Sequence, residues 1–115
     1  MIRIVPATAE MVRVYRGEDM PRSARVLAAV DDDRVLGIGG IYPDTARQIA
    51  FMDISDELRA HPRVLIRASR LVMQWVRDAK MPTHALCDEE IKRAAEFLEY
   101  LGFRRLYRGV FAWQK

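Results

Sequence analysis

The sequence predicts a single α/β domain in which helices pack on a mixed β-sheet. Turn residues divide residues 25–54 into three short apolar runs, which is the pattern of an antiparallel meander. Residues 62–80 and 88–101 then carry apolar residues at the helical period, and short apolar runs follow each of them. Such a segment indicates β-α-β units. The expected order is therefore β-α-β-β-β-α-β-α-β, over one domain that spans residues 1–115.

The N-terminal segment predicts a strand followed by a short helix. Residues 2–5 alternate apolar and polar side chains, and Pro6 closes the run. Thr8 can cap a helix by accepting a hydrogen bond from a backbone N–H in the next turn. Met11, Val14 and Tyr15 are then expected to share its buried face. Residues 17–23 are polar and indicate a loop.

The meander is expected over residues 25–30, 34–42 and 48–54. Three aspartates separate the first two strands, and Pro43 begins the second turn. Gly37, Gly39 and Gly40 lie within the second strand. They lack the third glycine of a dinucleotide-binding fingerprint, and they do not lie at a strand-to-helix turn. Close backbone packing or a bulge explains them better.

A long helix is expected from Pro62 to about residue 80, because proline suits the first turn of a helix. A short buried strand follows at residues 83–87. Asp88 can cap the next helix, whose positive end Glu89 and Glu90 favour. Gly102 can adopt the left-handed conformation that ends this helix. Residues 106–113 indicate a last strand.

Composition excludes several classes of protein. No apolar run approaches the roughly 20 residues that cross a bilayer, and the single cysteine, Cys87, cannot form an internal disulfide. A reducing, cytoplasmic setting is expected. The net charge of +3 suits an anionic ligand, but it is too small to indicate nucleic-acid binding. His61, His84 and Cys87 do not make a convincing zinc set, so we expect no metal site.

The C-terminal segment resembles that of the GNAT N-acetyltransferases. It runs from a helix through Gly102-Phe103 into a strand that ends Phe111-Ala112-Trp113, and the whole element order matches the GNAT order. A narrower likeness is to small GNAT-like proteins of tailed phages, including the internal virion protein A family of T7-like phages. Residues 36–40 (LGIGG), 61–70 (HPRVLIRASR) and 94–103 (AAEFLEYLGF) carry that likeness.

The resemblance implies a site for acetyl-CoA between the strand that ends near Ile54 and the strand at residues 83–87. Backbone groups of Ile54 and Ser55 would hold the pantetheine arm. The family's glycine-rich pyrophosphate loop is missing at residues 59–64, which implies a weaker or altered site. Two interpretations of the arginines stay open, either as ligands of the pyrophosphate or as a solvated helix face. The residues expected at the pyrophosphate are Arg63, Val64, Leu65, Ile66 and Arg67.

For catalysis, the resemblance implies direct acyl transfer to an amine of a small molecule or a protein. Asp53 is the candidate general base, with a turn cap as the open alternative, and Glu57 is expected to be solvated. The family's tyrosine acid is replaced by Leu98, and its asparagine by Ile91. These departures support an alternative, a catalytically eroded phage protein that acts in the virion or on a host protein.

Overall fold

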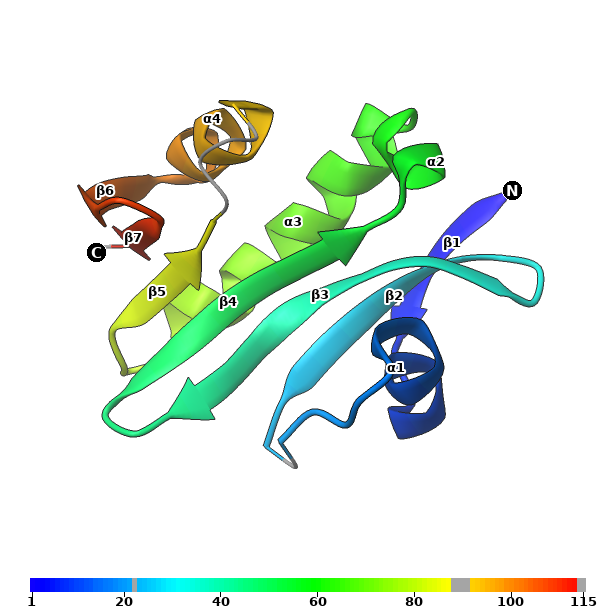
Figure 1. Cartoon of the computed structure of the whole chain (residues 1–115), viewed down its shortest axis with the longest axis horizontal. Helices are drawn as coiled ribbons and strands as arrows, with labels where there is room; N and C mark the ends of the chain where they lie inside the picture. Colours follow the sequence, from blue (N-terminus) through cyan, green and yellow to red (C-terminus); the bar gives the residue numbers. More distant parts are fainter. Residues whose placement is uncertain (22, 88–91, 114–115) are drawn as a thin grey trace.

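The computed structural model describes residues 1–21, 23–87 and 92–113. Its centre is a seven-stranded mixed sheet of order β1-β2-β3-β4-β5-β7-β6 (Figure 1). The predicted α/β class with a mixed sheet is confirmed. The strands are β1 (Ile2–Pro6), β2 (Arg25–Asp31), β3 (Arg34–Asp44), β4 (Arg47–Ile54), β5 (Thr83–Leu86), β6 (Phe103–Tyr107) and β7 (Val110–Trp113). The helices are α1 (Ala9–Arg16), α2 (Asp56–Arg59), α3 (Pro62–Asp78) and α4 (Lys92–Leu101).

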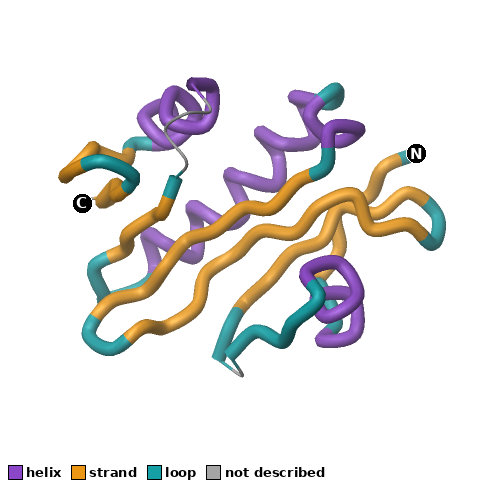
Figure 2. The backbone as a smooth tube through the Cα atoms, in the orientation of Figure 1, coloured by secondary structure: helices purple, strands orange, loops and turns teal. Residues whose placement is uncertain are grey.

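Helices cover the sheet on both faces (Figure 2). Ala28 of β2 packs beneath α1, whereas its neighbour Ala29 packs with Leu58 of α2. Adjacent residues of a strand point to opposite faces, so α1 lies on one face and α2 and α3 lie on the other. The main core lies on the α3 face around Val76 and Phe111, both 0% exposed, and α4 packs against the same core.

Several local predictions are confirmed. The Thr8 hydroxyl accepts a hydrogen bond from the Met11 N–H at 3.1 Å and caps α1. Pro62 is the first residue of α3. Gly102 has φ of +105°, the left-handed conformation expected after α4. Asp88, Glu89, Glu90 and Ile91, which the sequence assigns to the start of that helix, lie outside the described residues.

Two predictions are wrong. The C-terminal strand is a hairpin of β6 and β7, because Gly109 takes φ of +78° and reverses the chain. Val14 does not share the buried face of α1, since its side chain is 77% exposed. Val12 takes its place, together with Met11 and Tyr15. Among the described residues, no helix is long and apolar enough to span a membrane.

Candidate active site

A wedge opens between β4 and β5, which are parallel. The two strands pair at Gln48 with Thr83, Ile49 with His84, and Ala50 with Ala85. Beyond that point, residues 51–54 of β4 keep β3 as their strand partner, while Leu86 of β5 pairs with β7. Figure 1 shows β4 continuing past the end of β5. The last shared pair, Ala50 and Ala85, is the apex of the wedge.

A buried hydrogen bond closes the wedge below its apex. The Gln48 side-chain amide donates to the Thr83 hydroxyl at 2.7 Å. Both residues are among the few buried polar side chains, with exposures of 5% and 1%. A satisfied polar pair in a core fixes the register of its two strands, because a slip would leave both groups unpaired. The position of the apex is therefore well determined.

Backbone hydrogen bonds alternate in direction along β4, as they do in any antiparallel pair. The Ser55 N–H donates to the Leu36 carbonyl at 2.9 Å, so Ser55 faces β3. The Gln48 N–H donates to the Pro82 carbonyl at 2.9 Å, on the side of β5. Odd-numbered residues of β4 thus direct their backbone groups to β3, and even-numbered residues direct theirs to β5.

Met52 and Ile54 therefore direct their backbone N–H and C=O groups into the wedge, where β5 no longer pairs with β4. These groups form the edge of an incomplete strand pair, and an extended ligand with amide groups could complete it. The sequence predicted Ile54 and Ser55 for this role. Ser55 does not face the wedge, because its N–H is bonded to β3 and its hydroxyl caps α2, and Met52 faces the wedge beside Ile54 instead.

The start of α3 lies beyond the end of β4, after the short helix α2. The His61 carbonyl accepts hydrogen bonds from both the Val64 N–H, at 3.1 Å, and the Leu65 N–H, at 3.3 Å. Two of the amides that the sequence assigned to a pyrophosphate are thus bonded within the chain, and Pro62 has no N–H. The side chains of Val64 and Leu65 pack against the small core beneath α2, and Ile66 is partly buried.

The arginines of α3 are exposed along the helix, but their surroundings differ. Arg67 lines a hollow of ≈ 440 Å³ with Met1, Ile2, Asp31, His61 and Val64, beside the sheet edge formed by β1. On the same side, Arg25 of β2 lies over the Trp75 ring at 4.3 Å. Each helical residue turns about 100°, so Arg63 lies one turn before Arg67 on the same face of α3, about 40° away around the helix axis. Arg63 is exposed in the first turn of α3.

Asp53 is exposed on the α1 face of β4. Tyr15 of α1 lies on the same face, where its hydroxyl donates a hydrogen bond to the Leu36 carbonyl at 3.3 Å. Burial raises the pKa of Tyr15, and the negative charge of Asp53 raises it further. Asp53 lies three residues beyond Ala50, which is about 10 Å along an extended strand. The Asp53 carboxylate thus lies on the α1 face, about 10 Å along β4 from the apex of the wedge.

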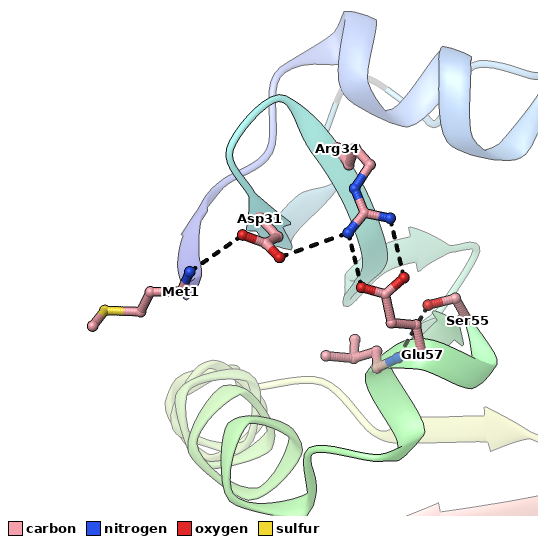
Figure 3. Close-up of polar contacts among 6 residues, drawn as sticks. Met1, Asp31, Arg34, Ser55 and Glu57 are labelled. Carbon is pink, nitrogen blue, oxygen red and sulfur yellow. Dashed lines mark hydrogen bonds and ion pairs between the residues drawn. The ribbon is translucent and has the colours of Figure 1, made fainter.

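Glu57 belongs to an ion-pair network rather than to the wedge (Figure 3). The Arg34 guanidinium donates to both of its carboxylate oxygens, at 3.0 and 2.9 Å. These hydrogen bonds hold the pKa of Glu57 below its usual range. The pair ties the turn between β2 and β3 to α2, and Asp31 joins it at 3.6 Å from Arg34. Glu57 is exposed, as expected, but it is bound to Arg34.

Leu98 is partly buried and packs against the main core, so it offers no proton to the wedge. Tyr100 is 65% exposed and stacks on Phe97 with ring centroids 6.3 Å apart. Within the described part of the chain, His, Cys, Asp and Glu side chains form no group of three or more that could hold a metal ion.

Comparison with known proteins identifies the fold. No protein-family model and no curated protein matches the chain. It is similar to a solved GNAT-family acetyltransferase from Staphylococcus aureus, with 11% identity, a TM-score of 0.61 and 98% of each chain covered. It is also similar to a mutant AtaT toxin bound to the C-terminus of the antitoxin AtaR, with 13% identity, a TM-score of 0.58 and 98% and 91% covered.

A third similar structure is a chimera of the spermidine N-acetyltransferase SpeG from Vibrio cholerae. It shares 14% identity and a TM-score of 0.58 over 96% of this chain and 90% of the other. The chain therefore has the GNAT fold over nearly its whole length, as the sequence pattern indicated.

Proposed function

We propose that this protein is an N-acyltransferase that binds acetyl-CoA in the wedge between β4 and β5 and transfers the acyl group directly to an amine. The observation that carries the proposal is the edge formed by Met52 and Ile54, whose backbone groups on this side pair with no strand among the described residues. The pantetheine arm contains two amides and is extended, so it can pair with this edge as an added strand would. Bound acetyl-CoA would supply an acyl group activated as a thioester.

The orientation of the cofactor follows from its charge. Arg63, which is exposed in the first turn of α3, would hold the phosphates, and the thioester would then lie toward Ala50 and Ala85. The α3 face of the sheet is filled by the main core, so the acceptor approaches from the α1 face. Similarity to a spermidine acetyltransferase favours an amine acceptor, of small-molecule or protein origin.

Calorimetry with acetyl-CoA and with CoA tests the proposal, followed by radiolabelled acetyl transfer to a panel of amines. We expect both forms of the cofactor to bind, because the pantetheine and the phosphates are common to them. Absence of binding would favour a second function, that of a virion or host-interaction protein. The self-bonded start of α3 and the leucine at position 98 support that alternative.

Charge reversal of the two arginines separates their roles. Arg63→Glu is expected to weaken binding of acetyl-CoA by about tenfold or more, the worth of one charge-assisted hydrogen bond. Arg67→Glu is expected to raise the dissociation constant less than Arg63→Glu does, because Arg67 lies one turn further along α3 and lines the hollow beside β1. Calorimetry of the two variants measures the difference, and equal losses would show that both arginines are at the site.

Asp53→Asn tests the predicted general base. The exposed carboxylate lies on the face from which a cationic acceptor arrives, so we propose that it attracts the acceptor. We expect the KM for the amine to rise about tenfold, while kcat falls less than tenfold. A fall in kcat of about 10²-fold or more would instead restore the role of general base that the sequence predicted.

A further inference from the structure

His84 lies in a row of side chains that crosses the sheet just below the wedge. Register pairs it with Ile49 of β4 on one side and with Ala112 of β7 on the other. Paired residues of neighbouring strands project from the same face. Tyr42 of β3 and Arg104 of β6 extend the row at its two ends.

The face that carries His84 is the α1 face. Its neighbour Ala85 packs into the main core beneath α3, so His84 points the opposite way. The cluster beneath α1 takes its strand residues from β1 to β4. As far as the chain is described, β5 contributes nothing to that cluster. The ring therefore belongs to the part of the α1 face from which the acceptor is proposed to approach.

The His84 ring contains a nitrogen that no described residue satisfies. Its Nδ1 is buried and has no hydrogen-bond partner among the described residues, and no other described side-chain nitrogen or oxygen shares this state. A buried polar atom without a partner costs free energy, and natural structures rarely keep one without a role. An imidazole can accept a proton near neutral pH, which the paired side chains of Ile49 and Ala112 cannot do.

His84 is also close to the apex of the wedge. It directly precedes Ala85, the last residue of β5 that pairs with β4. One residue of a strand spans about 3.3 Å and neighbouring strands lie about 4.8 Å apart. Asp53, in contrast, is three residues beyond the apex. A thioester held at the apex is thus nearer to His84 than to any acidic residue of β4.

We propose that His84 is the catalytic residue that takes the proton from the acceptor amine, an inference that rests on the proposed acyltransferase function. The amine nitrogen forms a bond to the acyl carbon while the carbon–sulfur bond breaks. The proton leaves the nitrogen for the His84 ring, and the sulfur departs as a thiolate. That proton then passes through water to the thiolate, which gives free CoA and regenerates the neutral ring.

The experiment compares two substitutions of His84 with one control. His84→Gln keeps a hydrogen-bonding side chain without a base and is expected to lower kcat about 10²–10⁴-fold, with unchanged acetyl-CoA affinity. His84→Gly is expected to show the same fall in kcat and to regain part of the lost turnover when imidazole is added. Arg104→Gln, in the same row but two strands further out, should keep wild-type turnover. Thermal melts verify that all three variants fold.

A second readout does not depend on turnover. The chain has two histidines, so the ring signals of His84 can be assigned in NMR spectra by their loss in His84→Gln. We expect acetyl-CoA to shift the His84 signals of the wild-type protein. Unshifted signals, or turnover of His84→Gln within about threefold of wild type, would overturn the inference and leave the proposed function standing.

Two other outcomes also decide the matter. Activity lost in His84→Gly but not restored by imidazole would show a structural role and would overturn the inference. Absence of acetyl-CoA binding by the wild-type protein would overturn the proposed function, and this inference with it.

Discussion

Replacing Met52 with proline is expected to weaken acetyl-CoA binding at least tenfold while the domain stays folded. The Met52 N–H points into the wedge and takes no part in the ladder with β3. Proline removes this donor and places its ring where the pantetheine would pair, so the loss exceeds the roughly 1 kcal/mol of a hydrogen bond. Calorimetry measures the affinity, and a thermal melt measures the fold.

Asp53→Pro is the matched control, one residue further along β4. The Asp53 N–H belongs to the ladder with Ile38 of β3, so proline there removes a bond from the middle of the sheet. We expect this variant to unfold or to melt far below wild type. If Met52→Pro binds acetyl-CoA as wild type does, the Met52 edge is not the pantetheine site. If both variants unfold, Met52→Gly decides whether the Met52 edge is the pantetheine site. Glycine keeps the backbone N–H, so this variant must retain acetyl-CoA binding.

Sequence patterns predicted the layers of the fold because they reflect local chemistry. Some residues act through their own backbone conformation or by capping a helix, so their effects can be recognised one residue at a time. Examples are Thr8, Pro62 and Gly102. The β6–β7 hairpin was missed because residues 106–113 contain one turn signal, Gly109, within an otherwise strand-like run. Val14 was misplaced because a helix of eight residues offers too few turns to fix its buried face.

The candidate site was only partly predictable, because its geometry depends on register. The sequence named Ile54 and Ser55 for the edge of the wedge, whereas the structure directs the backbone of Met52 and Ile54 to it, two residues related by the simple alternation of a strand. Sequence alone does not show whether the odd- or the even-numbered residues of β4 direct their backbone groups to β5. The Ser55–Leu36 hydrogen bond decides this. From the sequence, His84 is a candidate only for a metal ligand. Its significance depends on the point at which β4 and β5 separate, which no local pattern encodes.

The arginines of α3 illustrate the same limit. Arg63 and Arg67 are one turn apart and look equivalent in sequence. The structure places Arg67 in a hollow beside β1, which is an edge strand of the sheet. Strand order is a non-local property, so this hollow could not have been derived from the helical period.

Gly40→Ala is expected to destabilise the domain by about 3 kcal/mol or more, a large part of the stability of a domain of this size. The start of β2 passes directly over Gly40, where an added Cβ would overlap the Arg25 carbonyl oxygen and lie 2.9 Å from the Val26 Cα. Both atoms belong to the backbone and cannot rotate away. The two strands must therefore separate, which breaks their ladder and disturbs the cluster beneath α1.

Gly39→Ala provides the comparison within the same strand. The nearest atom to its added Cβ is the Phe51 carbonyl oxygen at 3.3 Å, a contact that a small shift relieves. We expect a loss of about 1 kcal/mol or less, because Gly39 has no positive φ that alanine would strain. Urea denaturation of both variants gives the two free energies of unfolding. Equal losses of unfolding free energy would show that both glycines serve the strand through flexibility. A larger loss for Gly40→Ala would show that glycine is needed at position 40 because β2 and β3 approach closely there.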